Sequence, residues 1–332
     1  MKISFIIPAY NEEFYIRECL ESIRQALIDK SYAAEIIVVD NGSTDRTKEI
    51  ASSMAGVTII DKPVKSVVRA RQTGFLASSG DLIANIDADS MLPPGWIDRA
   101  INEFTKNDKH VALSGPYIYY DIPKYFQYWV KFFYIIAFTT YLMNRFVLRV
   151  GSMLQGGNLV IRRSALKKLG GYNLDFNFYG DDTDIARRLY PIGDVKFSLS
   201  FNIYSSGRRI VKEGIFTMGI RYAANFIWAT YFKKPFSKNY IDVRTQKENG
   251  EVLKYEPLNK RRERLIIAAA IACFVFIIYG LNILIFGATT VKQVPKQLAL
   301  RMYNKIKNSD DSDSDFKTIK LEFNKIKNNI LH

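Results

Sequence analysis

The first 115 residues alternate short β-branched runs with stretches of helical periodicity, and this alternation narrows the fold more than any other feature. Strands are predicted at residues 2–7, 35–39, 57–60, 81–86 and 111–113. Between the first two strands, one apolar helix face is predicted from the spacing of Ile16, Leu20, Ile23 and Leu27. The pattern predicts an α/β domain whose mostly parallel sheet is covered by helices on both faces. Ligands of such sheets bind beyond the carboxyl ends of the strands.

Polar and acidic side chains follow three of these strand ends. Residues 8–13 follow the first strand, residues 40–45 the second and residues 87–89 the fourth. Taken singly, Asn11, Ser43 or Thr44 would be explained as a helix cap. Three such ends on neighbouring strands instead predict a ligand site.

Asp87 and Asp89 are the pair at these strand ends that most clearly indicates a chemical function. In an extended segment, residues i and i+2 point the same way, so both carboxylates can face one point. Two converging carboxylates require a cation, and oxygen ligands suit Mg²⁺ or Mn²⁺, which typically bridge protein carboxylates to substrate phosphates. The sequence therefore predicts a divalent metal site here.

Scarce residue types exclude several kinds of site. The chain has two Cys and two His, too few for a disulfide scaffold, a cysteine zinc site or a Ser-His-Asp triad. Carboxylates are thus expected to carry any proton transfer.

The formal net charge of +14 indicates a polyanionic partner, which could be nucleic acid, an anionic membrane or a phosphorylated substrate. Because no nucleic-acid-binding motif is present, we expect no nucleic-acid partner.

Residues 265–287 contain no charged side chain and are about as long as a membrane-spanning helix of ~20 residues. Lys260, Arg261, Arg262 and Arg264 precede the run, where cations meet lipid phosphates. We expect a C-terminal transmembrane helix; the alternatives are a buried core helix or a kinked, re-entrant segment.

Residues 124–149 and 215–232 are rich in aromatic side chains, which predicts either interfacial helices or helix packing within an enlarged domain.

Six sequence blocks resemble the family 2 glycosyltransferases. They are FIIPAYNEE (5–13), VVDNGSTD (38–45), ARQTG (70–74), DAD (87–89), GGN (156–158) and FYGDDTD (178–184). The resemblance covers about residues 1–235 and implies a GT-A fold, a nucleotide-sugar donor, a divalent metal and transfer with inversion. The Gln-x-x-Arg-Trp motif of processive relatives is absent from residues 205–209, which favours transfer of one sugar per encounter.

The resemblance also implies roles for individual residues. The nucleobase and ribose pocket would be lined by Pro8, Tyr10 and Glu12, with Asp40 accepting a hydrogen bond from the base, most simply from uracil. Arg71 would lie near the nucleotide, Asp87 would contact the ribose and Asp89 would bind the metal. The acceptor-side loop would be Gly156, Gly157 and Asn158.

An inverting transfer needs a base opposite the leaving diphosphate. The family's usual Glu-Asp pair corresponds to Asp181 and Asp182, so we expect Asp182 to be the base and Asp181 to bind or orient the acceptor. Either aspartate would alternatively cap a helix over residues 183–190. Arg208 and Arg209 are expected to clamp the diphosphate or to face solvent or lipid headgroups.

These expectations define four segments: a glycosyltransferase domain (1–235), a basic linker (236–264), a transmembrane helix (265–287) and a polar tail (288–332). The expected enzyme is membrane-associated, lies in the cytoplasm ahead of its anchor and uses a lipid-linked or saccharide acceptor. The alternatives are a metal-dependent nucleotidyltransferase and a non-catalytic membrane scaffold of the same fold. A nucleotidyltransferase should carry a Gly-rich basic loop after its first strand, where this chain has residues 8–13, PAYNEE.

Overall fold

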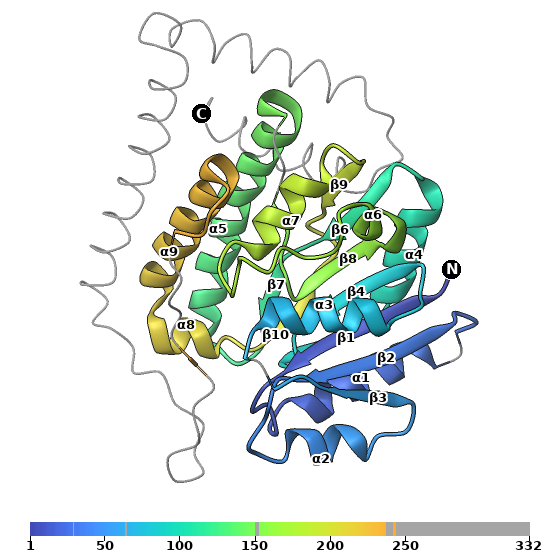
Figure 1. The fold of residues 1–332 in the computed structure, drawn as a ribbon. Helices are drawn as coiled ribbons and strands as arrows, with labels where there is room; N and C mark the ends of the chain where they lie inside the picture. The colour runs from blue at the N-terminus through green and yellow to red at the C-terminus, as the bar shows by residue number, and fades with distance from the viewer. Residues whose placement is uncertain (29, 64, 150–152, 237–241, 244–332) are drawn as a thin grey trace, which may run out of the picture. The chain divides into compact units, whose positions relative to one another are not determined.

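Seven strands of the computed structural model form one sheet in the order β3-β2-β1-β4-β8-β6-β9 (Figure 1). The structure describes residues 1–243 except 29, 64, 150–152 and 237–241. The described residues all belong to one compact unit. The strands are β1 (Ile3–Ala9), β2 (Ala34–Asp40), β3 (Val57–Asp61), β4 (Leu82–Ile86), β6 (His110–Ser114), β8 (Asn158–Arg162) and β9 (Asp194–Phe197). The mostly parallel α/β architecture predicted from the sequence is confirmed.

Strand β8 is the antiparallel member of this sheet and pairs with β4 and β6. The neighbours β1, β2, β3 and β4 are parallel, as are β6 and β9. In the register of β4 with β8, Ile86 at the end of β4 lies opposite Asn158 at the start of β8. The chain therefore enters β8 at the edge where the parallel strands end, which brings Gly157 beside Asp87 and Gly156 beside Arg71.

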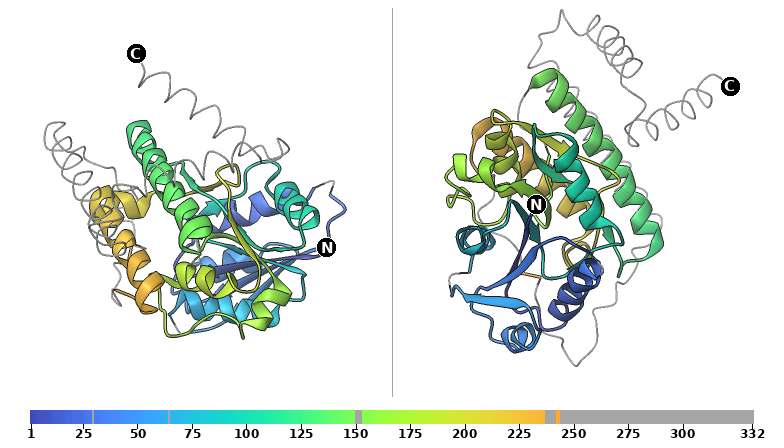
Figure 2. Two further views of the ribbon diagram at one scale, coloured as in Figure 1. Left: turned by 90° about the horizontal axis from the view of Figure 1, so that it is seen from above. Right: turned by 90° about the vertical axis from the view of Figure 1, so that its right-hand side faces the viewer.

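Helices cover both faces of the sheet, each over its own apolar core (Figure 2). One core contains α1 (Ile16–Leu27), α2 (Thr47–Ser52) and α4 (Trp96–Lys106). The other contains α3 (Val67–Ala77), α6 (Arg163–Lys168) and α7 (Asp181–Leu189). Successive strand residues alternate between the cores, because Phe5 and Ile7 belong to the first and Ile6 to the second.

The predicted apolar face of the first helix is confirmed. In α1, Ile16, Leu20 and Ile23 are fully buried, and Leu27 packs against the same core.

A second, three-stranded sheet in the order β5-β10-β7 was not predicted from the sequence. Its strands are β5 (Ser90–Met91), β10 (Ile203–Ser205) and β7 (Tyr117–Tyr119). Because β10 pairs antiparallel with β5, Ser205 lies opposite Ser90 and the backbone N–H of Ser206 donates to the Asp89 carbonyl (3.2 Å). The small sheet thus brings α8 (Arg208–Glu213) next to the Asp87–Asp89 segment.

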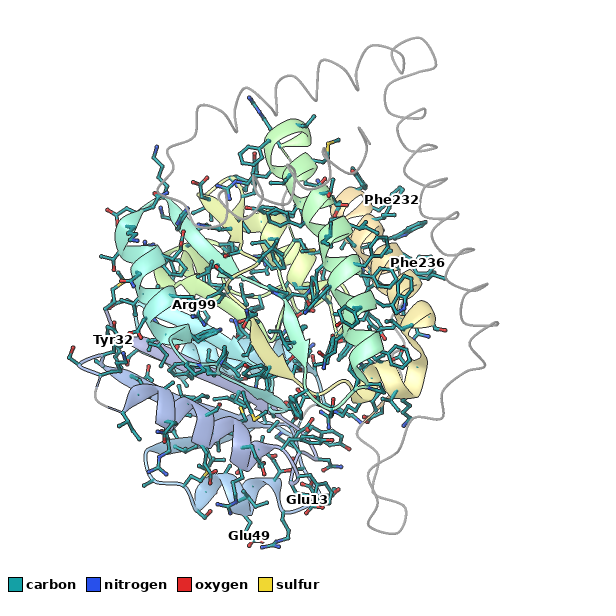
Figure 3. All side chains as sticks on the ribbon, turned by 180° about the vertical axis from the view of Figure 1, so that it is seen from behind. Glu13, Tyr32, Glu49, Arg99, Phe232 and Phe236 are labelled. Atoms are coloured by element: carbon teal, nitrogen blue, oxygen red, sulfur yellow. The ribbon has the colours of Figure 1, made fainter. Side chains whose placement is uncertain are left out.

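The two aromatic stretches form long helices that lie side by side (Figures 1 and 2). They are α5 (Lys124–Met143), continued by the π-helical turn η1 (Asn144–Leu148), and α9 (Ile215–Ile227), continued by η2 (Trp228–Phe232). A methyl group at Gly219 of α9 would lie 3.9 Å from the Phe133 ring of α5. Large apolar side chains remain exposed on both: Tyr128, Phe132, Ile135, Phe146, Ile220, Tyr222, Trp228, Tyr231, Phe232 and, just beyond, Phe236. Figure 3 shows Phe232 and Phe236 on the outside of the molecule.

Within the part of the chain that the structure describes, every helix is too short or too polar to cross a membrane. The run 265–287, predicted from the sequence to span the membrane, lies outside the described residues, as do most of the predicted linker and the whole tail.

Candidate active site

A cavity opens at the edge of the sheet where the parallel strands end. Most residues predicted from the sequence to form the site line it, namely Pro8, Glu12, Arg71, Asp87, Asp89, Gly156, Gly157, Asp181, Asp182, Arg208 and Arg209. The remaining three, Tyr10, Asp40 and Asn158, are not among its lining residues.

Arg71 of α3 joins two of the motifs. Its buried guanidinium lies 3.2 Å from the Asp87 carboxylate (Nη2 to Oδ1) and 2.5 Å from the Asp181 carboxylate (Nη1 to Oδ2). The helix that carries it lies close to β1, because a methyl group at Gly74 would be only 2.4 Å from Ile6. The Ala-Arg-Gln-Thr-Gly block thus supplies both a cation for the site and a helix surface that fits the sheet.

The backbone at Gly157 lies against the Asp87 carboxylate. A Cβ atom at Gly157 would be 1.9 Å from Asp87 Oδ2, so a larger residue fits only if the carboxylate moves. The hydroxyl of Tyr117 accepts a hydrogen bond from Gly157 N–H (2.9 Å) and lies 3.4 Å from Asp87 Oδ2. Tyr117 therefore holds the glycine loop and the carboxylate together.

Asp89 and Glu12 share a cation. The Arg208 guanidinium lies 2.9 Å from Asp89 Oδ2 and 2.7 Å from Glu12 Oε1, and its carbon is 4.7 Å from the centre of the Tyr15 ring. Arg208 was predicted to clamp a diphosphate or to face solvent or lipid; here it bridges the loops that follow β1 and β4.

Arg209, the next residue of α8, has partners different from those of Arg208. It pairs with the buried Glu213 (2.5 Å) and lies over the Phe178 ring at 4.6 Å. Arg209 also lines the cavity, and it shares the Glu213 carboxylate with Arg221 of α9.

Asp182 is the second residue of α7. The helix begins at Asp181, two residues before the predicted start, because Gly180 adopts the left-handed conformation (φ 82°) that ends the preceding loop. Hydrogen bonds from Thr183 N–H (2.7 Å) and the Thr183 hydroxyl (3.4 Å) both reach Asp182 Oδ1. Asp181 in contrast faces Arg71, so the two adjacent aspartates have different surroundings.

Asp40 lies at the end of β2 with one carboxylate oxygen satisfied and one not. Oδ2 accepts from the N–H groups of Gly42 (3.2 Å) and Ser43 (3.1 Å). Oδ1 is buried and has no hydrogen-bond partner among the described residues, while the residue is only 4% exposed. Since buried polar atoms are normally paired, this oxygen retains the capacity to accept a hydrogen bond.

Two predicted binding residues have other contacts. The ring of Tyr10 lies beneath the ammonium of Lys65, 4.2 Å from its centroid. Asn158 is fully buried, and its amide is bonded to Trp96 Nε1 (3.0 Å) and to the carbonyls of Gly115 (3.1 Å) and Phe201 (2.7 Å). The prediction that Asn158 contacts the acceptor is therefore corrected: its side chain fixes the start of β8, and Gly156 and Gly157 are what reach the cavity.

Comparison with known proteins identifies the family. The family model described as Glycosyl transferase family 2 matches residues 4–170, half of the chain. The chain belongs to glycosyl transferase family 2.

Relatives and solved structures of similar fold agree with this family 2 assignment. The probable glycosyltransferase YdaM of Bacillus subtilis is 30% identical over 217 residues, which cover 58% of this chain and 47% of that protein. The dolichol-phosphate mannosyltransferase of Pyrococcus furiosus is 36% identical over 126 residues, 36% of this chain and 34% of that protein. The chain spans between about a third and a half of the length of such curated relatives.

The mannosyltransferase PcManGT of Pyrobaculum calidifontis, solved in complex with GDP-Man and Mn²⁺, superimposes with a TM-score of 0.50 at 20% identity. The match covers 68% of this chain and 61% of that one. It shows that the two proteins share the fold, which is the GT-A-like fold expected of family 2.

Aromatic side chains that were not predicted as site residues also line the cavity. They are Tyr117, Tyr119, Phe178, Tyr179 and Tyr222. Phe178 and Tyr179 lie just before Gly180 and the Asp-Asp pair. Tyr117 and Tyr119 come from β7, and Tyr222 comes from α9. Phe178 and Tyr179 belong to the FYGDDTD block and Tyr222 to the aromatic stretch 215–232, whereas the only sequence signal for Tyr117 and Tyr119 was the high aromatic content of the chain, 14%.

Asp182 is also expected to set the pH dependence of this family 2 site. Burial, with a further contribution from the negative charge of Asp181, raises the pKa of Asp182 to about 7. A base must be ionised to accept a proton, so kcat/KM should fall about tenfold per pH unit below that pKa and level off above it. Initial rates from pH 5 to 9 check this, and a profile that is flat through neutrality would contradict it.

Proposed function

We propose that this protein is an inverting glycosyltransferase that transfers a sugar from a nucleotide-sugar donor to an acceptor hydroxyl, as the family assignment supports. The observation that carries the proposal is the convergence of two sets of carboxylates in one cavity. Asp87 and Asp89, which we take as the donor end, follow strand β4, and Asp182 at the start of α7 lines the same cavity. Arg71 connects the two ends through Asp87 and Asp181.

The charge of the cavity supports a divalent cation, Mg²⁺ or Mn²⁺, as cofactor. Five carboxylates line the cavity against three guanidinium groups, an unfavourable surrounding for a free diphosphate. Asp89 and Asp87 have the oxygen donors that such ions prefer. The described residues contain no cluster of three or more His, Cys, Asp or Glu, so the diphosphate itself would complete the coordination. When bound, the cation would neutralise charge on the leaving nucleoside diphosphate.

Individual aspartates of the chain then have separate roles in the transfer. The unpartnered Oδ1 of Asp40 accepts the imide N–H of a uracil base, which favours a UDP-sugar. Asp87 is held by Arg71 and supported by the Gly157 backbone, where it can orient the ribose. Asp182 takes the proton of the acceptor hydroxyl as that oxygen attacks the anomeric carbon, and Asp181 helps to orient the acceptor.

The acceptor side supports an amphiphilic substrate. Five aromatic side chains line the cavity, and one of them, Tyr222, also belongs to the exposed apolar side chains of α9. We therefore propose a lipid-linked acceptor, with a saccharide as the alternative, and one sugar added per encounter. The exposed side chains of α5 and α9 would lie at the membrane interface, ahead of an anchor at residues 265–287 and with the catalytic domain (1–235) in the cytoplasm.

The proposal is tested by a donor screen. Full-length protein is incubated with UDP- and GDP-sugars in the presence of Mn²⁺ or Mg²⁺, and nucleotide release is followed with and without EDTA. We expect metal-dependent release of UDP from one sugar donor, accelerated by a lipid-linked acceptor. Formation of a nucleoside triphosphate and a sugar 1-phosphate when pyrophosphate is added to the nucleotide sugar would instead indicate a nucleotidyltransferase. Absence of any nucleotide binding would indicate a scaffold.

Membrane attachment gives a separate prediction. The full-length protein should resist extraction by carbonate, whereas a chain that ends at Lys260 should not, because residues 265–287 are removed. The shortened chain should still bind vesicles of anionic lipid through α5 and α9, and salt should weaken this binding because it screens the contribution of Lys233 and Lys234.

Flotation with vesicles measures the residual binding. In the shortened chain, Phe232→Ser combined with Phe236→Ser should reduce it, since both rings are exposed. A matched change at an exposed apolar side chain of α3, Leu76→Ser, should not. Extraction of the full-length protein by carbonate alone would contradict the spanning helix.

A further inference from the structure

The donor end of the cavity contains an internal cation that bridges two of its carboxylates. Arg208 reaches Glu12 (2.7 Å) from the loop after β1 and Asp89 (2.9 Å) from the loop after β4. The Tyr15 ring lies against the guanidinium. This arrangement places one positive charge on the same carboxylate that the proposed function gives to the divalent cation.

Arg208 is held in this place by its backbone as well. The Ser206 hydroxyl and the Gly207 N–H both donate to the Asp121 carboxylate at 2.5 Å, and the N–H of Ser206 donates to the Asp89 carbonyl. At Gly207 a methyl group would be 2.2 Å from Ile122, so the turn fits only glycine. The contact of Arg208 with Asp89 therefore follows from the fold and does not depend on a freely rotating surface side chain.

A guanidinium and a divalent cation compete when they need the same oxygen. The Asp89 side chain is only 14% exposed, which leaves little room for both ions at Oδ2. Electrostatic repulsion between the two cations adds to the competition. A nucleoside diphosphate changes this balance, because it offers Arg208 new anionic oxygens with bidentate geometry that suits a guanidinium.

We propose that Arg208 is a positioning residue that competes with the divalent cation for Asp89 and moves to the diphosphate when the donor binds. The cation and the nucleotide then bind cooperatively, and the cation alone binds weakly. Thermodynamic linkage requires the effect to be reciprocal: UDP raises the affinity for Mn²⁺ by the same factor by which Mn²⁺ raises the affinity for UDP. The inference rests on the proposed function, since it assumes a nucleotide donor with a metal at Asp89.

The test measures Mn²⁺ binding to the full-length protein by electron paramagnetic resonance, without nucleotide and with saturating UDP. Arg208→Gln removes the competing charge and should tighten nucleotide-free Mn²⁺ binding on the order of tenfold, a usual size for coupling between sites. The increase in Mn²⁺ affinity caused by UDP should shrink in the same variant. Arg208→Lys keeps the charge, but its ammonium ends one bond short of the Nη2 atom that contacts both carboxylates, so this variant should lie between wild type and Arg208→Gln.

The matched control is Arg162→Gln, which removes the same charge at the end of β8 that lies opposite Leu82, away from the cavity. Nucleotide-free Mn²⁺ binding should therefore stay at the wild-type value. Thermal melting checks folding, and if Arg208→Gln does not fold, Arg208→Lys decides.

Mn²⁺ affinity that is unchanged or weakened in the folded Arg208 variant would overturn the inference. That outcome differs from failure of the proposed function, in which wild type would bind no UDP at any Mn²⁺ concentration.

Discussion

Asp182→Asn is expected to slow sugar transfer by about 10² to 10⁴, the usual contribution of general-base catalysis. Asparagine has the same size and can accept the hydrogen bonds that Thr183 donates to Oδ1, but it cannot take a proton from the acceptor. Nucleotide binding should be retained, because Asp40 and the Asp87–Asp89 pair are intact. Parallel measurements of UDP affinity and of the rate of transfer at saturating donor check both parts.

Stability supplies a folding control for this variant. Burial raises the pKa of Asp182 above its ordinary value, so between that value and about 7 the folded state binds more protons than the unfolded state. The contribution of Asp182 to stability therefore falls as pH rises through this window. Asparagine removes the cost of ionising a buried carboxyl, so at pH 8 the variant should melt at the temperature of wild type or above it.

Asp181→Asn is the matched comparison. It leaves Asp182 in place but removes the carboxylate that pairs with Arg71, which also holds Asp87. We expect weaker binding of acceptor, with a smaller effect on turnover at saturation than Asp182→Asn produces. If Asp182→Asn abolished nucleotide binding while Asp181→Asn affected turnover alone, the roles of the two aspartates would have to be exchanged.

The sequence was sufficient to predict the parts of the fold that are encoded locally. The five strands expected before residue 115 appear as β1, β2, β3, β4 and β6, each within two residues of its expected ends. Each is a β-branched run that ends at a polar or turn residue, so its hydrophobic pattern and its boundary lie within a few residues. Asp87 and Asp89 were identified in the same way, from their position directly after such a run.

Features that depend on distant partners could not be predicted. Strands β5, β7 and β10 have two or three residues each, too few for a periodic pattern, and they pair across many tens of residues. Arg208 and Glu12 are 196 residues apart, so their contact exists only once the small sheet has formed. The GGN motif shows the same limit, because one of its residues, Asn158, became part of the core when β8 paired with both β4 and β6.

Gly157→Ala is expected to reduce catalytic efficiency by about 10², because a displacement of about 1 Å at a reacting site has effects of this size. The added methyl would lie 1.9 Å from Oδ2 and 2.1 Å from Cγ of Asp87, so the carboxylate has to move. Movement of Asp87 strains its ion pair with Arg71 and the contact with Tyr117, which both set its direction. Gly157 is not among the glycines with positive φ, so the steric contact is the main cost of the change.

Gly219→Ala is the matched control for this substitution. Gly219 lies within α9, and the added methyl would meet Phe133 at 3.9 Å, an ordinary van der Waals distance. Alanine in a helix interior is more favourable than glycine by roughly 0.5–1 kcal/mol, so this variant should melt at an equal or higher temperature and bind UDP as wild type does. Gly157→Ala should instead lose UDP affinity and turnover together, while its circular dichroism spectrum remains that of the folded protein. A Gly157→Ala protein with wild-type kcat and wild-type UDP affinity would show that the position of Asp87 does not control donor binding.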